Sequence, residues 1–197
     1  MPLAAFRPLR HRSYARLWGA GLISNAGSWM QAVAVGALVT TITRQAAWTA
    51  LSFVAAFLPN GVLAPIAGAL ADRVDRRRFL ILANLAEASL ATVLAVLVAA
   101  GMRSPVVIVA IVFLEGCTSA MRIPFVQSML PDLVPRDDLL AAISLSSAQW
   151  NLGRVLGPAL AGVTIAATSF SVAFAVNAAS YLVVIAALAR VELPRHQ

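Results

Sequence analysis

Long apolar runs alternate with short charged segments along the whole chain. A helix needs about 20 mostly apolar residues to cross the ~30 Å hydrocarbon core of a bilayer. Six runs meet that requirement, at 17–41, 49–71, 79–100, 105–121, 139–166 and 170–189. The last two have no charge between them, and we expect their turn at 167–171; one long broken helix is the alternative and would make the number of spans odd. The pattern predicts an all-α membrane protein with six transmembrane helices.

The composition agrees with a membrane protein. Of the 197 residues, 60% are hydrophobic and 12% are charged, against roughly 45–50% and about 25% in soluble domains. The arginines that precede the first run resemble the start of a signal peptide. However, residues 17–43 form 27 uncharged positions, whereas a signal peptide core has about 7–15 and ends at a small-residue cleavage site. We therefore expect this run to be retained as the first span.

The distribution of arginine predicts the orientation. All 15 basic residues are arginine. Twelve lie before the first run, between the second and third, between the fourth and fifth, or after the sixth, and only Arg44 and Arg103 lie in the opposite loops. Because basic residues are retained on the cytoplasmic side, we expect a multi-pass protein of the bacterial inner membrane with both termini in the cytoplasm. Since the arginines lie between spans, the net charge of +7 indicates topology, and no nucleic-acid partner is expected.

These patterns divide the chain into three parts. Residues 1–16 are predicted to be a cytoplasmic segment, 17–189 a six-helix transmembrane domain, and 190–197 the start of a cytoplasmic linker or tail. The segment 122–138 is rich in proline and charge, and because proline interrupts helices we expect a cytoplasmic connector there. Asp137 and Asp138 are expected to cap the fifth span, where an acidic residue suits the helix dipole; a plain solvated loop is the alternative.

A charged turn separates the second and third spans. It carries the pattern Gly68-x-x-x-Asp72-Arg73-x-x-Arg76-Arg77. This pattern resembles the signature of the cytoplasmic loop between helices two and three in the major facilitator superfamily, although Asp75 stands where that signature has glycine. The resemblance implies that Asp72 and the arginines form a charge network that holds the cytoplasmic side shut in the outward-facing state. A topological anchor alone is the alternative.

The fifth span carries a second pattern of small residues. It reads Gly153-x-x-x-Gly157-Pro158-x-x-x-Gly162 and is similar to the signature of exporters in the same superfamily. Small residues at four-residue spacing permit close helix packing. The sequence leaves two interpretations open, generic packing and a helix that bends as a gate.

Together the two motifs make the chain similar to the N-terminal half of such a transporter. The stretch Phe6-Arg7-x-Leu9-x-x-x-x-Tyr14-x-x-Leu17-Trp18 and the variant Asp72-Arg73-x-Asp75-Arg76-Arg77-Arg78 most resemble the bacterial efflux group that includes enterobactin exporters. The resemblance implies half of a twelve-helix fold, built from two inverted three-helix repeats, with substrate bound between the halves. The expected partners are therefore membrane lipid, a small-molecule substrate, protons, and a second six-helix half from the same or another chain. No cofactor or metal is expected.

Three ionisable residues lie inside the predicted spans, namely Glu87, Glu115 and Arg154. A charge at the bilayer centre costs roughly 2.5–3.5 kcal/mol, so such groups usually face the bundle interior or a water-filled cavity. Glu87 and Glu115 are candidates to carry a proton whose flow drives export. A buried ion pair, with Glu115 and Arg154 as possible partners, or a permanently protonated glutamate is the alternative.

Polar residues also gather on one side of the first span. Asn25, Ser28 and Gln31 are spaced three apart and are candidates to line a substrate path. Hydrogen bonding to neighbouring helices is an equally good interpretation.

The leading hypothesis is secondary active transport, as proton-coupled export of a small organic molecule of the drug or siderophore class. A non-transporting half-length fragment or a regulatory membrane protein is the alternative. An enzyme is not indicated, because the two histidines, His11 and His196, lie in the terminal segments and no metal-ligand or phosphate-loop pattern occurs.

Overall fold

The computed structural model describes residues 2–71 and 73–191, and these are almost entirely helical. The elements are a 3-10 helix, η1 (Pro2–Arg10), and six α-helices: α1 (Arg12–Thr43), α2 (Ala46–Ala71), α3 (Arg76–Ala99), α4 (Pro105–Leu133), α5 (Arg136–Ala167) and α6 (Phe170–Ala189). The predicted turn between the last two spans is confirmed, since α5 and α6 are separate helices. Ser169 caps α6 by accepting a hydrogen bond from the backbone N–H of Val172 (3.4 Å).

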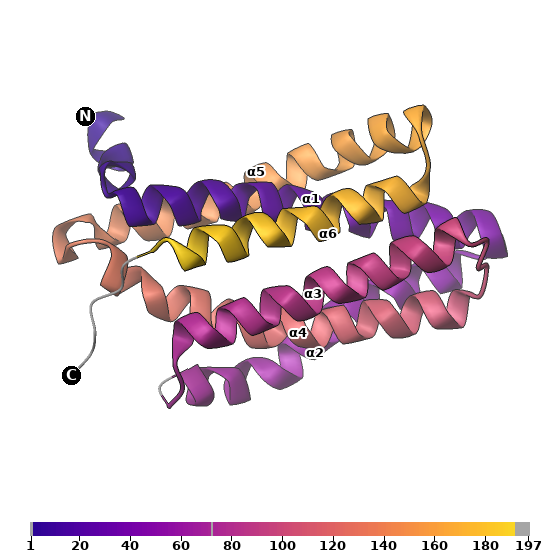
Figure 1. Ribbon diagram of the computed structural model, residues 1–197, viewed down its shortest axis with the longest axis horizontal. Helices are drawn as coiled ribbons and strands as arrows, with labels where there is room; N and C mark the ends of the chain where they lie inside the picture. The colour runs from indigo at the N-terminus through magenta and orange to yellow at the C-terminus, as the bar shows by residue number, and fades with distance from the viewer. Residues whose placement is uncertain (1, 72, 192–197) are drawn as a thin grey trace.

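The six α-helices lie side by side along the long axis of the molecule (Figure 1). Helix α1 packs mainly on α5 and α6, helix α4 packs mainly on α2 and α3, and extensive contact between α3 and α6 joins the two groups. The largest core cluster lies between these groups and includes Met30, Leu94, Ile108 and Phe174, none of them more than 1% exposed.

The outer surface is strongly apolar. Large side chains such as Val62, Leu82 and Val96 are at least 60% exposed, as expected of a protein whose solvent is lipid. Five helices, α1, α2, α3, α4 and α6, are long and apolar enough to cross a membrane. Helix α5 is not among them. It is long enough, but it carries serine, glutamine, asparagine and arginine side chains along its middle.

The predicted connector at 122–138 is wrong over most of its length. Helix α4 continues through Pro124 and Pro131 to Leu133, so that only Val134 and Pro135 connect it to α5. Membrane helices tolerate proline because neighbouring groups satisfy the backbone atoms that proline leaves unpaired.

The predicted position of two aspartates at the start of the fifth span is confirmed, since Asp137 and Asp138 lie in the first turn of α5. The predicted cap is wrong as a hydrogen bond, because the N-cap residue is Pro135 and no side chain caps the helix. Asp138 instead pairs with Arg7 (3.3 Å) and His11 (3.0 Å), which ties η1 and the start of α1 to α5.

Side-chain hydrogen bonds join α1 to α5 along their first halves. Tyr14 and Trp18 donate to the carbonyls of Ala142 and Leu145, each at 2.9 Å. Further along, Gln149 donates to the carbonyl of Trp18 and accepts from Asn25 (3.3 Å). These bonds hold α5 at a fixed rotation and height against α1.

The glycines of the α5 motif continue this contact. A Cβ atom at Gly153 would lie 2.8 Å from the Cβ of Asn25, and one at Gly157 would lie 2.8 Å from the backbone nitrogen of Met30 and would also overlap Trp29. Gly162 has open space around it. Close packing therefore accounts for the first two glycines and does not account for the third.

This difference gives a matched pair of variants. Gly157→Ala should destabilise the bundle by about 1–3 kcal/mol, because the added methyl group overlaps α1. Gly162→Ala should leave stability unchanged or raise it by up to about 1 kcal/mol through its higher helix propensity. Thermal unfolding of the two purified variants in detergent checks this, and equal unfolding midpoints would contradict the packing account.

Candidate functional site

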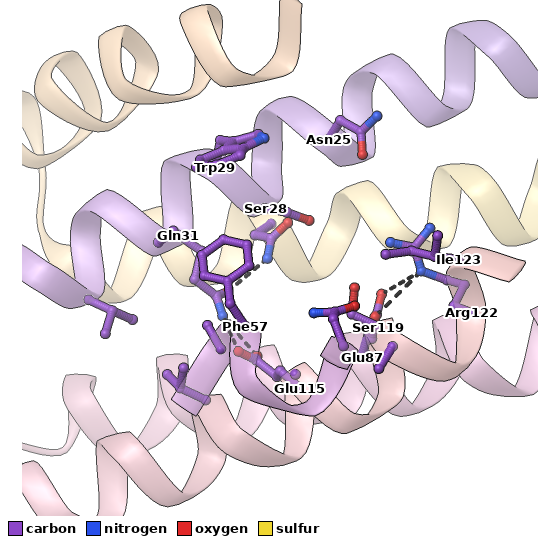
Figure 2. Close-up of a pocket in the computed structure, with 18 of the residues that line it drawn as sticks. Asn25, Ser28, Trp29, Gln31, Phe57, Glu87, Glu115, Ser119, Arg122 and Ile123 are labelled. Atoms are coloured by element: carbon purple, nitrogen blue, oxygen red, sulfur yellow. Dashed lines mark hydrogen bonds and ion pairs between the residues drawn. The ribbon is translucent and has the colours of Figure 1, made fainter. Parts of the chain in front are cut away.

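A cavity of about 410 Å³ lies in the middle of the bundle and is lined by side chains from all six α-helices. Figure 2 shows it with most of its lining residues. One part of the lining is polar and includes Asn25, Ser28, Gln31, Glu87, Glu115 and Arg122; another part is aromatic and consists of Trp29, Phe53, Phe57 and Trp150.

Glu115 on α4 is held by amide side chains. The side-chain nitrogen of Gln31 donates to both carboxylate oxygens of Glu115, at 2.8 and 2.7 Å. The side-chain oxygen of Gln31 accepts from Asn177 (2.8 Å), whose own side-chain oxygen accepts from Ser180 (3.1 Å). A chain of hydrogen bonds therefore runs from α6 through α1 to α4 and ends at the carboxylate. Among the described residues, Glu115 forms no ion pair.

Glu87 on α3 has a charged partner instead. The Nε atom of Arg122 lies 3.3 and 3.5 Å from the two carboxylate oxygens of Glu87. The side chain of Glu87 is 1% exposed and that of Arg122 is 15% exposed, so the pair lies inside the protein. The sequence placed Arg122 in a cytoplasmic loop, and the continuation of α4 through Pro124 puts it in the bundle.

The predicted pair between Glu115 and Arg154 is wrong. Arg154 lies on the exposed side of α5 with its Cζ atom 5.6 Å from the centre of the Trp29 ring. The cation–π contact explains how an arginine is accommodated here without a carboxylate.

The three polar residues predicted on the first span all line the cavity and all bond another helix. Ser28 shares a hydrogen bond with the hydroxyl of Tyr181 on α6 (3.1 Å), Gln31 bridges α6 and α4, and Asn25 donates to Gln149 on α5. The sequence left open whether these residues line a path or bond neighbouring helices. In the structure they line a cavity and bond other helices at the same time, so the two interpretations are compatible. Tyr181 was missed, because a lone tyrosine in an apolar run carries no signal of its own.

The charged turn between α2 and α3 connects to distant helix ends. Arg76 donates to the carboxylate of Asp132 (3.1 Å) and to the carbonyl of Ser128 (2.9 Å), both near the end of α4. Arg77 donates to the carbonyl of Ala189 at the end of α6 (2.6 Å). The arginines therefore tie the turn to the ends of α4 and α6.

The other members of this motif differ in their surroundings. Asp72 lies outside the described residues. Gly68 has open space around it and Arg73 is exposed. Asp75, the departure from the family pattern, caps α3 by accepting from the backbone N–H of Arg78 (3.0 Å).

A second cavity, of about 800 Å³, adjoins the first. Its lining comes from the start of α1, α3 and α5 and from the ends of α4 and α6, which is the end of the bundle that carries the charged turn. Four residues line both cavities, namely Asn25, Arg122, Ile123 and Trp150. The Glu87–Arg122 pair therefore stands at the boundary between the central cavity and one end of the bundle.

An apolar helical bundle with an internal polar cavity is typical of multi-pass membrane proteins. The family model described as "Transmembrane secretion effector" (MFS_3) matches residues 3–196. The chain belongs to this family of the major facilitator superfamily, whose members are membrane transporters.

Three curated bacterial proteins illustrate the relationship. The uncharacterized MFS-type transporter YfiS of Bacillus subtilis is 30% identical over 160 residues, which are 81% of this chain and 37% of that protein. The staphyloferrin A transporter of Staphylococcus aureus is 29% identical over 81% of this chain and 40% of its own length. The macrolide efflux protein A of Streptococcus pyogenes is 27% identical over 91% of this chain and 44% of its own length. The chain thus spans about two fifths of the length of these relatives.

The buried pair predicts a specific pattern of stability. Glu87→Gln should destabilise the chain by about 3–5 kcal/mol, because Arg122 then remains buried without a carboxylate. Combining Glu87→Gln with Arg122→Gln should recover most of that loss, since both charges are removed together. Thermal unfolding in detergent of the two single variants and the double variant measures the coupling, and additive losses would show that the two charges do not stabilise one another.

Proposed function

We propose that the chain is one six-helix half of a secondary active transporter that exports a small organic molecule in exchange for protons. The observation that carries the proposal is Glu115, a carboxylate in a central cavity of an apolar bundle whose described hydrogen bonds come from a neutral amide. Ionisable residues inside membrane proteins are costly and mark ion and substrate pathways.

In this proposal α5 also crosses the membrane, which makes six spans in all, and both termini are cytoplasmic. Residues 1–16 are then the cytoplasmic segment, 17–189 the membrane domain and 190–197 the start of the linker or tail. The packing supports two inverted three-helix repeats. Exchanging α1 with α4, α2 with α5 and α3 with α6 converts the α1–α5 contact into the α4–α2 contact, and the α1–α6 contact into the α4–α3 contact. The contact between α3 and α6 is converted into itself, as expected for a pseudo-two-fold axis between repeats.

Glu115 is a better proton carrier than Glu87. Glu87 is paired with Arg122 and is 1% exposed, so protonating it would leave the arginine without a counter-charge. Glu115 is partly exposed to the cavity, and its protonation leaves no buried cation unpaired. The fixed amides of Gln31 and Asn177 keep the carboxylate in place in either protonation state.

A second six-helix half completes the transport path. Helix α5 exposes a polar stripe at three- and four-residue spacing, formed by Ser144, Ser147, Asn151 and Arg154. A polar stripe is a poor surface for lipid, and the relatives are more than twice as long as the aligned part of this chain. We infer that the stripe faces the other half, from the same or another chain.

The charged turn acts as a cytoplasmic gate element in this scheme. Arg76 and Arg77 reach the ends of α4 and α6, so the turn moves together with the helix ends that surround the second cavity. Two of the relatives are named for a siderophore and for macrolides, which supports the drug or siderophore class of substrate.

Glu115→Gln tests the coupling. In proteoliposomes that hold the full transporter, a pH gradient should drive substrate accumulation by the wild type, and Glu115→Gln should reduce it to passive exchange. The other titratable side chains that line this cavity are Glu87 on α3, Arg122 on α4 and Tyr181 on α6, whereas the described residues of α1, α2 and α5 there are uncharged.

Asp137→Asn is the matched control, because it removes the same charge at an exposed position outside the cavity. It should respond to the gradient as the wild type does. If Glu87→Gln rather than Glu115→Gln abolished the response, Glu87 would be the carrier. Wild-type pH dependence in both glutamine variants would remove both residues from the mechanism, and no transport in any protein would favour a regulatory role.

A further inference from the structure

The segment that precedes α1 is folded against the bundle. Helix η1 packs on α1 and α5. Arg7 and His11 both pair with the carboxylate of Asp138 on α5, at 3.3 and 3.0 Å. Pro8 is buried, and Leu9 packs on a core cluster between α1 and α5. Both polar and apolar contacts therefore hold η1 in one orientation relative to the bundle.

Helix η1 does not continue the direction of α1. The backbone of His11, the N-cap residue of α1, is extended, and from there η1 turns away from the long axis of the bundle (Figure 1). The candidate membrane spans run along that axis. An element that turns away from it at the end of the bundle therefore lies close to the plane of the membrane surface. Amphipathic segments bind the headgroup region of a bilayer in this orientation.

Helix η1 is both amphipathic and basic. A 3-10 helix has three residues per turn, so residues three apart lie on the same face. Phe6 lies on the face of Leu9, one turn nearer the N-terminus, and is 56% exposed. Arg7 and Arg10 share the neighbouring face. An apolar row therefore leads from the packed side chain of Leu9 to an exposed aromatic ring, with arginines beside it.

The exposed charge around η1 is positive. Arg10, Arg12 and Arg16 are exposed, and within the part of the chain that the structure describes none of the three forms an ion pair. The exposed charges at the start of α5, on Arg136 and Asp137, cancel one another. Guanidinium groups can donate two parallel N–H groups to a phosphate. This surface is therefore complementary to a negatively charged headgroup.

We propose that η1 and the start of α1 form a docking surface for an anionic phospholipid, in which Arg10 and Arg12 contact the phosphate and Phe6 enters the acyl-chain boundary. A lipid accounts for the exposed ring as well as for the arginines, whereas a soluble phosphate accounts only for the arginines. The inference goes beyond the proposed transport. It requires only that this end of the bundle lies at a membrane surface, so it holds for either orientation of the chain.

Native mass spectrometry of the 197-residue chain, released from detergent micelles, tests the proposal because it resolves each bound lipid. The chain is titrated with phosphatidylglycerol, with phosphatidylcholine and with glycerol phosphate, and the dissociation constant of the first bound molecule is measured for each. We expect phosphatidylglycerol to bind more tightly than phosphatidylcholine, since only the former carries a net negative charge. Glycerol phosphate, which has the charge without the acyl chains, should bind far more weakly.

Two double variants of equal charge locate the binding. Arg10→Gln with Arg12→Gln should weaken phosphatidylglycerol binding about 10- to 30-fold, the effect expected for two arginines at an anionic surface, and should leave phosphatidylcholine binding unchanged. Arg44→Gln with Arg103→Gln removes the same charge from exposed positions in the loops at the other end of the bundle and should bind both lipids as the wild type does. All four side chains are exposed, so helix content by circular dichroism should not change.

Phe6→Ser tests the apolar part of the surface. It should weaken the binding of phosphatidylglycerol and leave that of glycerol phosphate unaffected, because only the lipid has chains for the ring to contact.

Three results would overturn the proposal. The first is unchanged phosphatidylglycerol affinity after removal of Arg10 and Arg12. The second is an equal loss in the two double variants, which would reflect net charge rather than a site. The third is binding of glycerol phosphate as tight as that of the lipid, which would indicate a site for soluble phosphate. The titration involves no transport, so a transporter without lipid preference would refute this inference alone, and a chain that binds the lipid without transporting would refute the proposed function alone.

Discussion

Charged side chains are costly inside an apolar bundle, and this cost determines how the residues of the central cavity are arranged. Two carboxylates and one arginine line a cavity surrounded by helices whose outer surfaces are apolar. One carboxylate, Glu87, meets the arginine, and the other, Glu115, meets an amide chain that begins on α6. The two glutamates therefore differ in their partners, because Glu87 has a charged partner and Glu115 has a neutral one. Glu87 is balanced within the described residues, whereas the hydrogen bonds that Glu115 accepts there come from a neutral amide.

The surrounding helices hold these groups in position. The hydrogen bonds and glycine contacts between α1 and α5 fix Gln31 against the rest of the bundle, since Asn25 and Gln31 lie on the same helix. On the other side, Gly116 brings α4 against α2, where an added Cβ would lie 2.7 Å from the carbonyl oxygen of Ala56. Both sides of the cavity are therefore built on close backbone contacts, and the polar residues are carried by helices that cannot easily rotate.

The length of the apolar runs predicted the helices and the separate turn between α5 and α6, because a helix that crosses the hydrocarbon core has a length of about 20 residues. The same reasoning failed at α4. Proline is a reliable helix breaker in water, and the rule was applied to Pro124 and Pro131, but in this bundle α4 passes through both. That error hid Arg122, and with it the partner of Glu87. The pairing of side chains across helices depends on helix rotation, and for this reason the Glu115–Gln31–Asn177 chain could not be derived from positions along the sequence.

We propose that Glu115 is the carboxylate that takes up and releases a proton in the cavity. Infrared difference spectroscopy of the 197-residue chain in lipid, recorded between acidic and alkaline pH, observes the carbonyl stretch of a protonated carboxyl group directly. Other acidic residues titrate over the same range, so the prediction concerns one component of the carboxyl band. This component is present in the wild type, persists in Asp137→Asn and disappears in Glu115→Gln. A band that remains in Glu115→Gln and is lost in Glu87→Gln would contradict the account.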